Sequence, residues 1–404
     1  MSEVLSFDTV VVGAGQAGPF LAAKLVAQGQ KVALIEARDL GGTCVNRGCT
    51  PTKTLRKSAR VAYIARRASE FGVELGPVKI NFAVAMERMQ RRVDESRRGL
   101  EGWLGNLKGL SIFKAHGRLA GREGADFVVH AGEARLKAPH VVLNTGTRPW
   151  SAPITGLAGH PFLDNESLLA LRERPDKLVI LGGGYISLEM AQIFRRLGSD
   201  VVVIERAPRL TAREDADVSA AITEMLVAEG IEVLTGVAVQ EVTSGDTPGG
   251  SCVVLSDGRK VQGSHLLVAT GRVPNTDNLG LDSVGLKTTE RGYLDTNDRL
   301  ETQVPGIQGA WRHQSAQRVH PHQLPRSRNR CRKPGRRTPE RRRSDQDLCD
   351  VYRPSIGTCR AVRSRRQTLG RPRQTDLSSR TRHERCQQSQ RRERDRGCNQ
   401  TSDR

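Results

Sequence analysis

The sequence predicts an α/β protein with two parallel sheets, followed by a C-terminal segment that has no fold of its own. Three observations lead to this fold class. Residues 7–36 and 176–206 each show an apolar strand, a glycine-rich turn, a helix and a second apolar strand. From residue 308 onward this alternation stops and arginine dominates.

The first unit is "FDTVVVGAGQAGPFLAAKLVAQGQKVALIE". A strand ends at Val12, a helix runs through Gln28, and a second strand closes on Glu36. A G-x-G-x-x-G pattern fills the turn: Gly13, Gly15 and Gly18. The first glycine permits the tight turn, the second lets the backbone approach a pyrophosphate at the helix N-terminus, and the third lets helix and strand pack closely. Because Glu36 can accept hydrogen bonds from a ribose, this context favours a Rossmann-like dinucleotide-binding unit over an ordinary glycine-rich turn.

The second unit repeats the pattern. Gly182 and Gly184 take the first two glycine positions, Ser187 takes the third, and Glu205 ends the following strand. Serine is small enough to keep the helix near the sheet, so we expect a second dinucleotide site. The glutamate favours the free 2′-hydroxyl of NAD, but nearby arginines either meet a 2′-phosphate or form a solvated surface: Arg206, Arg209 and Arg213. The preference stays open, and two units indicate a flavin paired with a nicotinamide.

Between the units lies "GGTCVNRGCTPTKT", residues 41–54, which we call the cysteine turn. Cys44 and Cys49 are too far apart for a C-x-x-C motif, and no second cluster follows at zinc spacing, so we expect no metal. If this stretch starts a helix, the two sulfurs lie about one turn apart and can form a disulfide. A helix N-terminus and a lysine lower a thiol pKa, so redox chemistry is favoured over two inert buried thiols.

At these residues the sequence resembles the class I pyridine nucleotide-disulfide oxidoreductases, which include dihydrolipoamide dehydrogenase, glutathione reductase and mercuric reductase. The resemblance covers residues 7 to about 307 and is carried most specifically by G-G-T-C-x-x-x-G-C-x-P-x-K. It implies FAD on the first unit and NAD(P)H on the second. Electrons would pass from nicotinamide to flavin, to the disulfide and on to an acceptor.

The resemblance also implies roles for individual residues. Cys49 would face the flavin, and Cys44 would be the interchange thiol that meets the acceptor. Lys53 would lie by the flavin N5, paired with Glu189, because a buried cation there needs a partner carboxylate. Tyr185 would cover the nicotinamide pocket. The turn "GCTPTK" looks most like the mercuric-reductase-like branch, so the expected acceptor is a small-molecule disulfide or a metal ion such as Hg(II).

Further cofactor contacts follow from two segments that resemble the family's crossings between the FAD and NAD domains, "NTGTRP" (144–149) and "ATGRVPN" (269–275). Arg272 in the second would lie near the flavin. Gly117 would make a backbone contact near the adenine end. The full set of additional cofactor residues is Gly42, Thr43, Gly117, Thr145, Gly146, Gly271 and Arg272.

Four segments follow from these motifs. Residues 1–150 are expected to form the first part of an FAD domain, 151–272 an NAD(P) domain, 273–307 an incomplete return to the FAD domain, and 308–404 an arginine-rich, disordered tail. No run of about 18 apolar residues exists and no basic flank precedes the first apolar stretch, so we expect no membrane span and a cytoplasmic protein.

The tail carries nearly all of the net charge. It holds 27 of the 64 Lys+Arg residues and 9 of the 44 Asp+Glu residues, hence +18 of the formal +20. Its only lysine is Lys333. An evolved basic arm for nucleic acid or an acidic partner usually mixes lysine with arginine and interleaves glycine or aromatics, so we consider a nucleic-acid role a weaker alternative. A third alternative is an NAD(P)H-binding module without turnover.

We favour a different origin for the tail. The segment "TQVPGI" (302–307) resembles the approach to the family's last FAD motif, but the expected Gly-Asp is absent. Reading the codons one nucleotide out of register from Gly309 requires a glycine at the Trp311–Arg312 junction and permits Ala-Leu before it and Asp after it. The tail is thus interpreted as a family C-terminus translated out of frame. The family's homodimer, with its His-Glu pair from the partner subunit, is then not expected of this chain, and FAD binding and turnover should be impaired.

Overall fold

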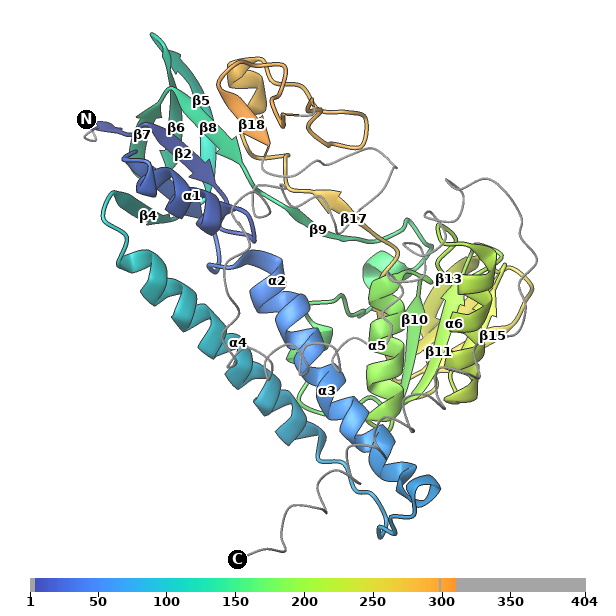
Figure 1. The fold of residues 1–404 in the computed structure, drawn as a ribbon. Helices are drawn as coiled ribbons and strands as arrows, with labels where there is room; N and C mark the ends of the chain where they lie inside the picture. Colours follow the sequence, from blue (N-terminus) through green and yellow to red (C-terminus); the bar gives the residue numbers. More distant parts are fainter. Residues whose placement is uncertain (1–3, 298, 310–404) are drawn as a thin grey trace, which may run out of the picture. The chain divides into compact units, whose positions relative to one another are not determined.

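A computed structural model describes residues 4–297 and 299–309, and the predictions for residues 310–404 lie outside this part. The described residues form helices and several sheets, two of them entirely parallel, as the sequence predicts. Figure 1 shows their order along the chain.

The first parallel sheet contains five strands in the order β18-β8-β2-β3-β4. Its strands are β2 (Thr9–Val12), β3 (Val32–Glu36), β4 (Leu110–Lys114), β8 (His140–Leu143) and β18 (Ile307–Gly309). Helix α1 (Gly18–Ala27) joins β2 to β3, and α4 (Phe82–Gly105) precedes β4. All four residues of β2 are buried, because strands of a parallel sheet are covered on both faces, and this explains their unbroken apolar runs.

The second parallel sheet has four strands in the order β12-β11-β10-β16. They are β10 (Lys177–Leu181), β11 (Asp200–Glu205), β12 (Glu232–Thr235) and β16 (His265–Val268), with helices α5 (Tyr185–Arg196) and α6 (Ala216–Ala228). An antiparallel sheet lies between β12 and β16 in sequence: β13 (Val239–Ser244), β14 (Ser251–Leu255) and β15 (Lys260–Gly263).

The remaining elements connect or extend these sheets. A four-stranded sheet combines the N-terminal strand β1 (Val4–Ser6) with three strands that lie between β4 and β8 in sequence: β7 (Ala134–Ala138), β6 (Asp126–Ala131) and β5 (Gly117–Glu123). Helices α2 (Gly42–Arg47) and α3 (Cys49–Arg66) follow β3, and short 3₁₀ turns cover Ala68–Phe71, Leu157–Gly159, Leu168–Ala170 and Leu281–Val284. From here on, the part of the chain built around the first parallel sheet is called the first unit, and the part built around the second parallel sheet the second unit. The chain leaves the first unit through β9 (Thr147–Trp150) and returns to it through β17 (Gly271–Pro274). These two strands pair antiparallel, and we call them the crossover strands.

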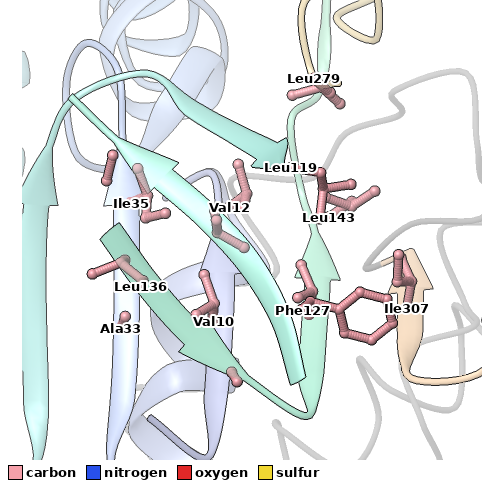
Figure 2. Close-up of a cluster of buried hydrophobic side chains, with 14 of the residues drawn as sticks. Val10, Val12, Ala33, Ile35, Leu119, Phe127, Leu136, Leu143, Leu279 and Ile307 are labelled. Atoms are coloured by element: carbon pink, nitrogen blue, oxygen red, sulfur yellow. The ribbon is translucent and has the colours of Figure 1, made fainter. Parts of the chain in front are cut away.

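The segment after β17 completes the core of the first unit. Figure 2 shows Leu279 and Ile307 in the same apolar cluster as Val10, and the ring of Phe127 points toward Ile307. Ile307 is fully buried, and burial of such a side chain contributes about 1.5–3 kcal/mol. The first unit is therefore built from two stretches of chain that flank the second unit.

The end of the predicted body differs by two residues from the structure. The sequence pattern places the change of character at residue 307, whereas β18 continues through Gln308 and Gly309. Both residues pair in parallel with β8, opposite Val142 and Leu143. Two more backbone pairs therefore extend the sheet beyond the last apolar side chain, which the side-chain pattern alone did not indicate.

Candidate functional site

The first glycine turn leaves room for a ligand at one of its three glycines. Gly13 has a φ of 103°, and a Cβ there would collide with the Asn144 carbonyl oxygen. A Cβ at Gly18 would collide with the carbonyl oxygen of Gly13. At Gly15 a Cβ would meet only the Asn144 side-chain nitrogen, at 3.4 Å, so another molecule can approach this backbone. Helix α1 has no side-chain cap, and because Pro19 has no N–H, the backbone donors that its start can offer an anion are those of Gly18 and Phe20.

The second glycine turn has the same construction. Gly182 has a φ of 107°, and a Cβ there would lie 2.6 Å from the Ala269 carbonyl oxygen. A Cβ at Gly184 would meet nothing within 4 Å, and α5 begins directly after it without a side-chain cap. The open position is thus the second glycine in both units, which is the position at which a pyrophosphate approaches the backbone.

The carboxylates at the ends of β3 and β11 fold back over these turns. Glu36 accepts hydrogen bonds from the N–H groups of Ala14 (2.7 Å) and Arg38 (2.9 Å). The second unit repeats both bonds, at 2.5 and 2.6 Å: Gly183 N–H and Ala207 N–H to Glu205. Each carboxylate is therefore fixed beside its glycine turn, and its remaining lone pairs can accept ribose hydroxyls.

Three further predicted residues lie near the second turn. Ser187 is fully buried on α5, and its hydroxyl has no hydrogen-bond partner within the part of the chain that the structure describes. Tyr185 is the first residue of α5, half-exposed, and its hydroxyl donates to the carboxylate of Glu214. Arg206 is exposed directly after Glu205.

The cysteine turn forms two helices rather than the single helix start that its sequence predicts. Cys44 lies within α2 and Cys49 is the first residue of α3, with the break at Gly48. A Cβ at Gly48 would lie 2.9 Å from the Thr43 carbonyl oxygen, so the chain can fold back this tightly only at glycine. Both thiols are free and hydrogen-bond each other.

The two thiols differ in acidity. The hydrogen bond from Cys44, and then the positive charge of Lys53, lower the pKa of Cys49 from 9.0 to about 6, against the opposing effect of burial. The same hydrogen bond, together with burial, raises the pKa of Cys44 far above its usual range. Near neutral pH the reduced pair therefore carries one thiolate, on Cys49, and one thiol, on Cys44.

Lys53 and Glu189 form an ion pair between α3 and α5. They are 136 residues apart in sequence, and each side chain is partly exposed. Lys53 lies one helical turn after Cys49, which explains how it acts on that thiol. The structure thus brings Cys49, Lys53 and Glu189 together around the N-terminal end of α3, and Cys44 interacts with Cys49.

The cysteine turn also touches the first glycine turn. A Cβ at Gly42 would lie 2.7 Å from the Gly15 Cα, and the N–H of Gly41 donates to the Ala14 carbonyl (2.8 Å). Thr43 follows, exposed, in the first turn of α2, a helix without a side-chain cap. A molecule lying on Gly15 would therefore lie next to the start of α2.

The predicted crossing residues lie at the crossover strands. Asn275 binds both turn carbonyls, through its backbone N–H to Gly146 (3.1 Å) and its side-chain amide to Thr145 (2.9 Å). Gly271 pairs with Trp150 in the register of β17 and β9.

Arg272 is tied to the opposite crossover strand. Its guanidinium donates to Thr147 through Nε (2.7 Å, to Oγ1) and Nη2 (2.6 Å, to the carbonyl). Burial lowers the pKa of Arg272 from its ordinary value.

Gly117 has an explanation within the protein itself. It is buried at the start of β5, and a Cβ there would lie 2.8 Å from Val12 Cγ1 and 3.3 Å from Ile35 Cδ1. Close packing of β5 on the first sheet therefore requires glycine. Its predicted contact with an adenine stays a prediction.

Three residues of this region were missed at the level of sequence. Asn144 donates its side-chain amide to the Gly13 carbonyl (2.9 Å) and so fixes the glycine turn from β8. Asn165 and Glu166 contact Arg47, one of the four residues between the two cysteines. Only Asn144 lay in a recognised motif; a polar turn such as "DNES" has no sequence signal that points to a partner more than a hundred residues away.

The described residues contain no group of three or more His, Cys, Asp or Glu side chains that could hold a metal ion. Among these residues no helix is both long and apolar enough to cross a membrane.

Known proteins resemble this chain in sequence and in fold. The family model "Pyridine nucleotide-disulphide oxidoreductase" matches residues 7–309. Dihydrolipoyl dehydrogenase of Cupriavidus necator is 33% identical over 315 residues, covering 74% of this chain and 66% of that protein. Mercuric reductase of Acidithiobacillus ferrooxidans is 34% identical over 306 residues, covering 74% of this chain and 55% of that protein.

A solved structure has a similar fold. The HOCl-induced flavoprotein disulfide reductase RclA from Escherichia coli superposes with a TM-score of 0.66 at 30% identity, covering 75% of this chain and 65% of that one. The chain thus spans between about half and two thirds of the length of these relatives. With a family match over most of its described residues, the chain belongs to the pyridine nucleotide-disulphide oxidoreductases, a family of enzymes that depend on FAD and NAD(P)H.

Proposed function

We propose that this chain is built to pass electrons from NAD(P)H through FAD to a Cys44–Cys49 disulfide and on to an acceptor. The asymmetric thiol pair carries the proposal: Cys49 is poised as a thiolate at the N-terminus of α3, beside Lys53, and hydrogen-bonded to the Cys44 thiol. Two inert structural thiols would not need one pKa lowered and the other raised.

The residues present fit both cofactors. For FAD, the open backbone of Gly15 and the uncapped start of α1 offer N–H groups to a pyrophosphate, and Glu36 offers a carboxylate to a ribose. For NAD(P)H, the open backbone of Gly184 and the uncapped start of α5 play the same part, with Glu205 as the carboxylate. When bound, these groups supply hydride and electron transfer.

The chain's own residues then prepare the thiol chemistry. Lys53 places a positive charge beside Cys49 and stabilises negative charge there, while Glu189 compensates the lysine. Cys44 holds the proton of the pair and must lose it to attack an acceptor, so the raised pKa makes that step dependent on a base. We propose a small-molecule disulfide or a metal ion as the acceptor. Two observations support a thiol-binding metal ion: the relatives include mercuric reductases, and a structural neighbour is a Cu(II) complex.

The experiment compares the three cysteines of residues 1–309. The purified chain is mixed with excess FAD under anaerobic conditions, reduced with NADH or NADPH, and assayed for free thiols before and after. We expect two thiols to appear in the wild type and in Cys252→Ala, which removes a buried cysteine of β14, and neither to appear in Cys44→Ser or Cys49→Ser. Equal thiol release in all four proteins would contradict the proposal.

The alternative of a basic arm for nucleic acid has no support from the relatives, which are named for redox reactions. It falls on the arginine-rich segment, which lies outside the described residues. The cytoplasmic location and the loss of the homodimer remain predictions.

A further inference from the structure

A short segment links the second sheet to the cysteine turn. Leu163 extends the sheet at β16: its N–H donates to Leu266 (2.7 Å) and its carbonyl accepts from Val268 (2.8 Å). Directly after it, Asp164 accepts from the N–H groups of Glu166 and Ser167, both at 2.8 Å. These bonds fix the conformation of the segment independently of the cysteine turn.

Asn165, in the middle of this segment, bridges two elements of the site. Its side-chain nitrogen donates to the Arg47 carbonyl (3.0 Å), and its side-chain oxygen accepts from Nη1 of Arg272 (3.3 Å). Asn165 is 8% exposed, so both bonds lie away from bulk water and the loss of either would leave a buried polar group unpaired.

The carbonyl that Asn165 holds belongs to a sensitive position. Arg47 is the last residue of α2, and Gly48, where the backbone turns into α3, follows it. A carbonyl at a helix C-terminus has no partner within the helix, so the asparagine satisfies a group that would otherwise be free to reorient. The Arg47 side chain is held as well, by an ion pair with Asp39 and by one with Glu166 (3.2 Å from Nε).

We propose that Asn165 is a positioning residue for the Cys44–Cys49 pair: by holding the Arg47 carbonyl it fixes the angle between α2 and α3 and hence the distance between the two sulfurs. The inference rests on the proposed function only in giving that pair its role. Glu166 supports the same geometry through the Arg47 side chain. We call the two hydrogen bonds of the Asn165 side chain, to the Arg47 carbonyl and from Arg272, the clamp. Its bond to Arg272 connects the cysteine turn to the crossover strands.

The test reads the acidity of Cys49, which depends on that geometry. Its pKa is set by groups from three elements: Cys44 on α2 and Lys53 on α3 lower it, and Glu189 on α5 raises it. If the clamp is lost, the thiol–thiol hydrogen bond weakens and the pKa rises. The full chain is reduced, alkylated with iodoacetamide across the pH range, and Cys49 labelling is followed by peptide mass spectrometry.

Two variants and one matched control carry the comparison. Asn165→Ala removes both hydrogen bonds, and Asn165→Leu removes them while keeping nearly the same side-chain volume. Asn106→Ala removes one bond of the same kind elsewhere, from an exposed asparagine side chain to the Gly102 carbonyl (2.8 Å) at the end of α4. We expect both Asn165 variants to raise the Cys49 pKa by about one unit, which slows labelling about fivefold near pH 6, and the control to match wild type.

The outcomes separate the inference from the proposed function. A wild-type Cys49 with an ordinary thiol pKa would overturn the proposed function. A low wild-type pKa that Asn165→Leu leaves unchanged would overturn the inference, even if that variant melts at a lower temperature. If neither Asn165 variant folds, Glu166→Gln, which is partly exposed, takes their place. It must raise the Cys49 pKa for the inference to stand.

Discussion

At the scale of single residues, one hydrogen bond between two thiols makes them chemically different. A pair with equal acidity would share its negative charge, whereas in this pair the thiolate is assigned to Cys49 by Cys44 and Lys53 together. Because the thiolate is the reactive form, Cys49 should be the faster thiol to react with an electrophile throughout the range near pH 6 to 8. The assignment also explains why the lysine follows Cys49, and not Cys44, by one helical turn.

The contribution of Lys53 to the low pKa of Cys49 can be measured directly. Lys53→Met removes the positive charge and keeps the length of the side chain, so the Cys49 pKa should rise, by less than one unit because Lys53 is partly exposed and solvent screens its charge. The pH profile of Cys49 alkylation checks this. Lys57→Met, one turn further along α3 and exposed, should leave the profile unchanged. An equal shift in both variants would show that the Cys49 pKa depends on the total positive charge of α3 and not on Lys53 in particular.

Glu205 gives a prediction about the nicotinamide cofactor. Two backbone N–H groups hold its carboxylate in place, so it cannot turn away from a 2′-phosphate. We expect NADH to bind about tenfold more tightly than NADPH, because like charges repel, and Glu205→Ala to reduce that ratio. Calorimetric titration of the chain with each nucleotide measures it. Glu224→Ala, an exposed carboxylate on α6, is the control; a wild type that prefers NADPH would refute the expectation.

At the scale of the elements, the two strand–turn–helix units differ most at the third glycine position. In the second unit Ser187 stands there, and its buried hydroxyl has no hydrogen-bond partner among the described residues. Removing an unpaired buried hydroxyl relieves its desolvation cost, so Ser187→Ala should raise the free energy of unfolding by about 1 kcal/mol. Urea denaturation measures the change. Ser219→Ala, which loses a buried bond to the Leu210 carbonyl (2.6 Å), should destabilise the chain instead.

The first glycine turn separates a folding role from a binding role. Gly18→Ala pushes a methyl group into the Gly13 carbonyl and should lower the melting temperature markedly. Gly15→Ala meets only a side-chain nitrogen at 3.4 Å, so the fold should persist while FAD binding weakens. Thermal melts and quenching of flavin fluorescence report the two effects. If Gly15→Ala binds FAD as wild type does, the pyrophosphate does not lie on this turn.

The two units could be predicted from sequence because each is local: about thirty residues contain strand, turn, helix and terminal carboxylate. The Lys53–Glu189 pair could be predicted only through the resemblance, since no local pattern joins residues 136 positions apart. The break of the cysteine helix at Gly48 depends on a close backbone contact with the Thr43 carbonyl, which the pattern of side chains does not record. The clamp by Asn165 depends on a segment that is fixed to another sheet. Such contacts leave no periodicity or spacing to detect.

At the scale of the whole molecule, the first unit closes only after the chain has passed through the second and returned as β18. The family match ends at residue 309, where that strand ends, and the arginine-rich segment begins next to it. The relatives are longer than the matched part by a third or more of their own length. The end of the last strand of the described fold and the start of the arginine-rich segment therefore lie within three residues of each other in the sequence.

The interpretation of residues 308–404 as a shifted reading frame can be tested at the gene. Sequencing across codon 308 should reveal that a shift of one nucleotide opens a frame encoding the missing Gly-Asp motif and an interface domain. The chain translated in that frame should be a yellow homodimer, because FAD would regain its last contacts, whereas the chain with the arginine-rich segment should lose flavin on gel filtration. An uninterrupted gene for the arginine-rich segment, with its peptides detected by mass spectrometry in the native protein, would refute this origin of the tail.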